Sequence, residues 1–163
     1  MASVNQLIDE AVEATKEDDY LRALTIFMDV YGGEDPPLPT NTKAAAALSF
    51  FALCLALVQK KFKPAIDLGR RAVDLQFYNP DHWVNLTKIY AAAGQRRKAV
   101  ETAETGLKQH RDYEPLRAAR AALGVRARPA VPFLDRAHPI NVSLGQSRHA
   151  KSVAKGEGRK RPK

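Results

Sequence analysis

The chain has few of the residues that export, membrane insertion or disulfide bonding need. It contains one cysteine, Cys54, which excludes an internal disulfide and favours a reducing compartment. No apolar run reaches the roughly 20 residues of a membrane span. The nearest candidate, residues 44–58, contains Ser49 and is flanked by Lys43 and Lys60. The amino terminus has neither a basic start nor an apolar core, so it does not resemble a signal peptide. We therefore expect a soluble cytoplasmic protein.

The sequence also lacks a recognisable set of catalytic or cofactor-binding residues. Its histidines, His82, His110, His138 and His149, have spacings that suit no metal motif. No second cysteine is present to bind a metal together with Cys54, and no glycine-rich loop carries the Lys-Ser/Thr pair that holds phosphate. We expect no enzymatic activity, no cofactor and no metal site.

The positive charge is concentrated at the carboxyl end. The net charge is +8, and residues 125–163 contain six Arg and four Lys against two acidic residues. Residues 1–124 contain sixteen charges of each sign. A neutral body argues against a nucleic-acid-reading face on the fold, so the tail is the electrostatic candidate.

The stretch from Asn79 to Gly94 predicts one well-bounded helix. Pro80 suits the first turn, Asn79 or Asp81 can cap it, and Gly94 supplies the left-handed residue that ends it. A second helix is predicted from Arg96 to Lys108. Its inner face carries small residues that allow a close approach to the first helix: Ala99, Ala103 and Gly106.

This helical hairpin resembles the tetratricopeptide repeat (TPR). The residues at the positions of the family's Trp, Leu, Tyr, Gly, Ala and Ala are Trp83, Leu86, Tyr90, Gly94, Ala99 and Gly106. A shift of 34 residues back from Arg96, Ala99 and Gly106 reaches Phe62, Ala65 and Ala72. A third copy, with its aromatic residue at Tyr20, is offset by eight residues, which fit an insertion at 32–39. The resemblance implies an all-α fold: a right-handed stack of three TPR-like hairpins with a capping helix and an irregular basic tail.

We predict two parts of the chain. Residues 1–124 form the repeat domain, with repeats at about 4–37, 46–79 and 80–113 and a cap at 114–124. Within it, residues 44–58 are apolar nearly all round, which indicates a central inner helix. Residues 125–163 form a proline-containing strap and a basic, disordered tail. The apolar residues between Val131 and Leu144 either fold back on the stack or dock onto another protein.

Stacks of this kind bind partners on their concave face. The resemblance places these residues there: Asn5, Ile8, Val12, Phe50, Cys54, Leu57, Asp81, Val84, Asn85 and Lys88. Burial in the core is the favoured alternative for Cys54 and Leu57, and both interpretations stand for Phe50 and Val84. Only Asn85 and Lys88 match the residues with which some members hold a terminal carboxylate. We therefore expect an apolar groove suited to an amphipathic helix or an extended apolar segment.

The predicted function is that of a protein–protein interaction module, such as an adaptor, a scaffold or a secretion-type chaperone. Its partner is another protein or a peptide segment, with self-association through Phe50 and its neighbours as an open alternative. The alternative function is that of a nucleic-acid- or ribosome-associated accessory protein. Its cations would be Arg148, Lys151, Lys155, Arg159, Lys160 and Arg161. No aromatic residue lies among them, so any contact would be to phosphate, weak and salt-sensitive.

Overall fold

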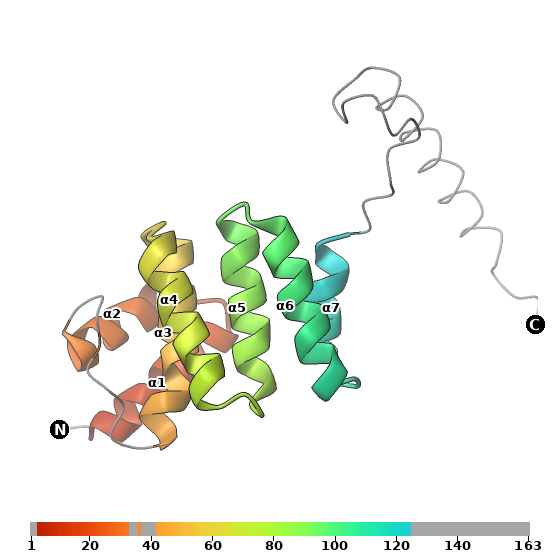
Figure 1. Cartoon of the computed structure of the whole chain (residues 1–163). Helices are drawn as coiled ribbons and strands as arrows, with labels where there is room; N and C mark the ends of the chain where they lie inside the picture. The colour runs from red at the N-terminus through yellow and green to blue at the C-terminus, as the bar shows by residue number, and fades with distance from the viewer. Residues whose placement is uncertain (1–2, 33–35, 37–41, 125–163) are drawn as a thin grey trace, which may run out of the picture. The chain divides into compact units, whose positions relative to one another are not determined.

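The computed structural model describes residues 3–32, 36 and 42–124. The predictions for the tail, including the strap and its cations, lie outside these residues. The described part is all-α, with seven helices and no strand, as expected for the fold class (Figure 1). The helices are α1 (Val4–Lys16), α2 (Tyr20–Tyr31), α3 (Thr42–Val58), α4 (Phe62–Leu75), α5 (Pro80–Ala92), α6 (Arg96–Gln109) and α7 (Glu114–Ala122).

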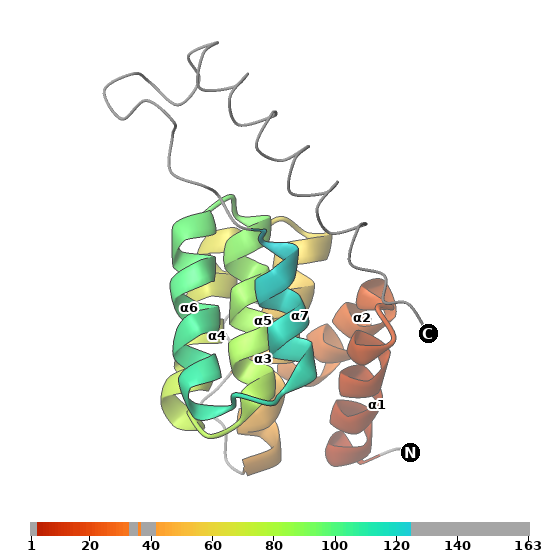
Figure 2. The same ribbon diagram turned by 90° about the vertical axis from the view of Figure 1, so that its right-hand side faces the viewer.

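The helices pack as successive neighbours. α1 packs on α2, α3 on α4 and α5 on α6, while α3 also contacts α1 and α5, and α5 also contacts α7. Within the described ranges, α2, α4 and α6 make no contact with one another. α4 and α6 lie on one side of α3, α5 and α7, and the α1–α2 pair lies on the other (Figure 2). One face of α3, α5 and α7 is therefore bordered by α1.

A 34-residue spacing relates the later helices. α4 and α6 begin at Phe62 and Arg96, which are 34 residues apart, and the starts of α5 and α7 have the same spacing. Ala65 and Ala99 occupy equivalent positions in α4 and α6, and both are completely buried. The spacing thus corresponds to equivalent packing in three dimensions.

The helix ends follow local rules that the sequence displays. Ser3 forms a capping box with Gln6 at the start of α1. The Asn79 side chain accepts a hydrogen bond from the Asp81 amide at 3.1 Å, and Pro80 occupies the first turn of α5. Gly94 ends the same hairpin helix with a φ of 72°, a conformation that costs glycine little. The predicted cap and stop of α5 are confirmed.

The core is centred on α3. Its residues from Ala47 to Ala56 are all buried, because α1, α2, α4 and α5 surround the helix. Phe51 packs against Phe27 and Tyr31, with ring centroids 5.7 and 5.4 Å away. Such tilted aromatic pairs stabilise a core by about 1 kcal/mol beyond the burial of their area. No helix in the described ranges is both long and apolar enough to cross a membrane.

Candidate partner-binding pocket

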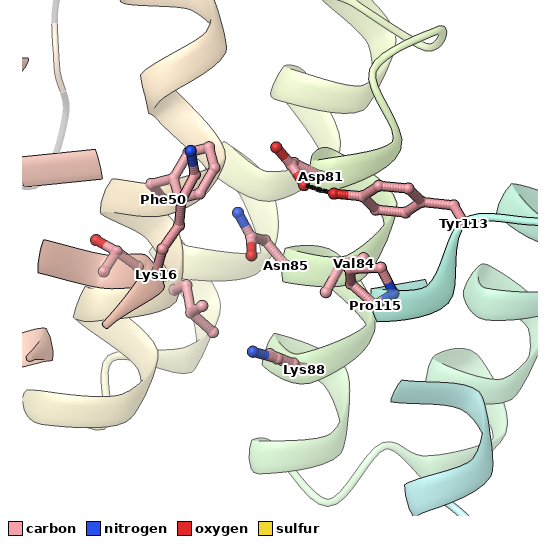
Figure 3. A pocket seen from close by; sticks show the side chains of 10 residues that line it. Lys16, Phe50, Asp81, Val84, Asn85, Lys88, Tyr113 and Pro115 are labelled. Carbon is pink, nitrogen blue, oxygen red and sulfur yellow. Dashed lines mark hydrogen bonds between the residues drawn. The ribbon is translucent and has the colours of Figure 1, made fainter. Parts of the chain in front are cut away.

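A pocket of about 430 Å³ opens on the face of α3, α5 and α7 that α1 borders (Figure 3). Four helical segments line it: the end of α1, the middle of α3, the first two turns of α5 and the start of α7. The lining residues are Thr15, Lys16, Phe50, Leu53, Asp81, Val84, Asn85, Lys88, Tyr113 and Pro115. The pocket therefore joins segments that are up to about a hundred residues apart in the chain.

Half of this lining belongs to the residues predicted for the groove. Those that line it are Phe50, Asp81, Val84, Asn85 and Lys88. Phe50 and Val84 are each 6 % exposed, so they form the wall of the pocket and pack into the core at the same time. The two interpretations left open for them are both satisfied by one position at the edge of the core.

The remaining predicted groove residues do not line the pocket. Ile8 and Cys54 are buried in the core, while Val12 and Leu57 are half-buried and pack against it. Asn5 is exposed on α1. Burial raises the pKa of the Cys54 thiol to about 11, and its sulfur lies 3.5 Å from the Thr15 hydroxyl. The thiol is thus a protonated, closely packed core group.

Five lining residues were not predicted from the sequence: Thr15, Lys16, Leu53, Tyr113 and Pro115. The repeat spacing contains a signal for Pro115, because it lies 34 residues after Asp81. The start of α7 accordingly lines the same face as the start of α5. No comparable signal exists for Thr15 and Lys16, because the insertion after α2 breaks the phase of the first pair.

A buried chain of hydrogen bonds supports Asn85 from behind. Asn85 Nδ2 donates to Ser49 Oγ at 3.1 Å, and Ser49 Oγ lies 2.7 Å from Nδ1 of His82. His82 Nε2 lies 3.3 Å from Gln76 Oε1, and Gln76 Nε2 donates to the carbonyl of Thr42 at 3.0 Å. The side chains of this chain are all at least nine-tenths buried.

The last bond of the chain sets the direction of the others. Because the Gln76 amide nitrogen donates to a carbonyl, its oxygen accepts from His82 Nε2, and His82 Nδ1 then accepts from the Ser49 hydroxyl. Burial lowers the pKa of His82 to about 4, which agrees with this neutral tautomer. Asn85 donates into the chain, and its Oδ1 accepts from none of the described residues.

The charged groups of the pocket differ in how they are engaged. Asp81 accepts a hydrogen bond from the Tyr113 hydroxyl (Figure 3). Burial, with this bond as a second cause, raises the pKa of Tyr113 to about 12. Lys16 forms an ion pair with Glu13 at 2.8 Å. Lys88 is exposed and forms no ion pair within the described part of the chain. The pocket therefore offers an apolar wall, one free amide oxygen and one free ammonium group.

Comparisons with known proteins add no family to these observations. Neither a scan against protein-family models nor a search of curated proteins finds a match to the chain.

Proposed function

We propose that this chain is a protein–protein interaction module of the adaptor, scaffold or chaperone-like kind. The pocket between α1, α3, α5 and α7 would hold an apolar segment of the partner. One observation carries the proposal: an apolar wall of Phe50, Leu53, Val84 and Pro115 adjoins a free amide oxygen and a free ammonium. Apolar walls with a few fixed polar groups are typical of sites that bind a ligand in one orientation.

We also propose that the helical pairs are TPR-like repeats. The proposal is supported by the equal spacing of α4 and α6 and of α5 and α7, and by the buried small residues at equivalent positions in α4 and α6. Repeat stacks use a face lined by the first helix of each pair to bind extended or helical segments. The pocket lies on the corresponding helices here.

The pocket can be filled without disturbing the core. Pro115 is exposed at the start of α7, where a helix tolerates most residues, so Pro115→Arg places a long charged side chain at the pocket. We expect this variant to recover at least about tenfold less partner than the wild-type chain in affinity capture from the source cells. A tenfold loss corresponds to about 1.4 kcal/mol of binding free energy.

Ala118→Arg is the matched control. Ala118 is exposed on the same helix and does not line the pocket, so its variant should capture the partner as the wild-type chain does. Hydrogen exchange on the captured complex should show protection of α3 and α5 around Phe50 and Asn85. Equal capture by both variants, or protection confined to other helices, would refute the proposed site.

A further inference from the structure

A second groove lies between α4 and α6, on the opposite face of α5 from the pocket. α5 contacts both helices, whereas the described residues of α4 and α6 do not contact each other. Figure 1 shows α5 between them. Two adjoining pockets of about 470 and 340 Å³ occupy this gap and share Arg70, Tyr90 and Lys98. We refer to these two pockets together as the α4–α6 groove.

The floor of the α4–α6 groove is apolar and aromatic. Ile66 of α4 lines one pocket, Trp83 of α5 lines the other, and Tyr90 of α5 lines both. Trp83 and Tyr90 are largely buried beneath the groove, at 9 % and 6 % exposure. The face that they present is wide enough to receive an aliphatic side chain from outside.

The rim of the groove is basic. Lys63, Arg70 and Lys98 line it, and none of them forms an ion pair with a described residue. The Lys98 ammonium lies 5.7 Å from the centroid of the Tyr90 ring. Two carboxylates also line the groove: Asp67, which is not in an ion pair with a described residue, and Glu101, which Arg97 holds at 2.9 Å. Three cations therefore face one uncompensated carboxylate.

The complementary surface lies on the first helical pair. Between Ser3 and Gly32 the sequence has seven acidic and two basic residues. The acidic residues of α1 are already paired: Asp9 with Lys43, Glu10 with Arg22 and Glu13 with Lys16. The turn between α1 and α2 is different, because Glu17, Asp18 and Asp19 form no ion pair in the described part of the chain. We call this turn, together with Leu21, the acidic corner.

Leu21 gives the acidic corner an apolar anchor. It is 67 % exposed, the highest exposure among the large apolar side chains of the described residues. Three carboxylates beside an exposed leucine match, in sign and in polarity, three ammonium or guanidinium groups around an apolar floor. Desolvated apolar contacts with a charged rim are the usual composition of a specific protein interface.

We propose that the acidic corner of one copy of this chain docks into the α4–α6 groove of a second copy. The corner of a given copy cannot reach its own groove, because the α1–α2 pair lies across α3, α5 and α7 from α4 and α6 (Figure 2). The contact is therefore head-to-tail, with two different surfaces on each copy, and it leads to dimers and longer chains rather than to a closed symmetric pair.

Sedimentation velocity on the full chain tests the contact through two neutralising variants. The groove variant is Arg70→Gln/Lys98→Gln, and the corner variant is Glu17→Gln/Asp18→Asn/Leu21→Ser. Asn suits position 18 because the backbone there has a φ of 63°. Wild-type protein should associate in a concentration-dependent manner that raised salt weakens. Each variant alone should associate at least about tenfold more weakly.

A one-to-one mixture of the variants gives the sharpest result. Each mixed pair keeps one intact groove and one intact corner, so the mixture should form dimers and nothing longer. Lys108→Gln/Arg111→Gln is the matched control, since it removes two exposed cations that lie outside the groove, and it should associate as the wild-type chain does.

Three outcomes would overturn the proposal. One is wild-type protein that stays monomeric at every concentration. Another is a groove variant that associates normally while the corner variant does not, which would assign the acidic corner to a different occupant. The third is a mixture that remains monomeric although each variant has a wild-type circular dichroism spectrum and melting temperature. All three leave the proposed function of the pocket between α1 and α7 untouched.

Discussion

At the scale of single residues, the buried chain from Gln76 to Asn85 carries most of the polar order in the core. Ser49 and His82 are 33 residues apart and meet at 2.7 Å, with no exposed surface on either. A buried polar group is costly unless its hydrogen bonds are made. The chain satisfies His82 at both ring nitrogens, and it therefore holds Asn85 in one orientation at the pocket.

His82 should make the stability of the fold depend on pH. Burial lowers its pKa to about 4 in the folded state, against 6.5 as the ordinary value. The unfolded chain therefore takes up a proton first, and stability is lost as the pH falls from about 6.5 towards 4. The loss should approach about 3 kcal/mol at the lower limit. Urea unfolding of the full chain at a series of pH values measures it.

His82→Gln isolates this contribution. The variant loses stability at all pH values because the hydrogen-bond chain is altered, but its stability should fall by about 3 kcal/mol less between pH 6.5 and 4. The difference between the two profiles cancels the other titrating groups of the chain. Parallel profiles for the two proteins would show that His82 takes up its proton equally well in the folded state.

At the scale of elements, α3 illustrates how position determines composition. The helix contacts four others, so it has no side that faces water along most of its length. The nearly continuous apolar run at residues 44–58 is the sequence counterpart of that position. The central placement of this helix could thus be inferred before any coordinates were available.

The closest approach between elements is at Gly106 in α6. A Cβ atom placed there would lie 2.8 Å from Trp83 Cβ of α5 and 2.8 Å from Leu116 Cδ2 of α7. Both distances are far below the ordinary contact distance of carbon atoms, about 3.5–4.0 Å. Gly106 therefore sets how tightly α6 fits between the two neighbouring helices.

Gly106→Ala should lower the free energy of unfolding by about 1–2 kcal/mol. Overpacking of this kind costs about 1–3 kcal/mol, and the better helix propensity of alanine offsets up to about 1 kcal/mol of that cost. Gly69→Ala is the comparison, because the Cβ there meets only the ends of Leu86 and Ile89 at 3.1 and 3.2 Å. Its cost in urea unfolding should be smaller. A Gly106→Ala protein as stable as wild type would mean that α6 can shift outward freely.

At the scale of the whole molecule, the distribution of charge separates three regions. The first helical pair is acidic, the later helices carry an excess of cations, and residues 125–163 account for the net charge of +8. Charge layouts of this kind govern association and its salt dependence rather than the fold. The polarity within residues 1–124 is hidden by their zero net charge.

The carboxyl-terminal residues should dominate binding to polyanions. The full chain should be retained on a polyanion column at low salt, and a chain that ends at Gly124 should elute with much less salt, because ten cations are removed. Strong retention of the shortened chain would instead point to the basic rim of the α4–α6 groove. The salt concentration at elution is the measured quantity.

Several parts of the candidate site could be predicted because the repeat spacing carries over from sequence to space. Asp81, Val84, Asn85 and Lys88 share one face of α5 by helical periodicity alone, and Phe50 precedes Val84 by the 34-residue period. Thr15 and Lys16 were missed, since their place depends on how α1 crosses α3, which no periodicity encodes. The hydrogen-bonded partners of Asn85 were missed for the same reason.

The sequence by itself determined the helices, their ends, the buried central helix and the uneven distribution of charge. These features depend on residues that are close together in the chain or on a repeated spacing. Only the tertiary structure decided which side chains close the pocket, which polar groups are paired behind it, and that a basic groove and an acidic corner lie on opposite sides of the body. Those features depend on contacts between distant segments, and a one-dimensional pattern does not specify how two packed helices are placed against each other.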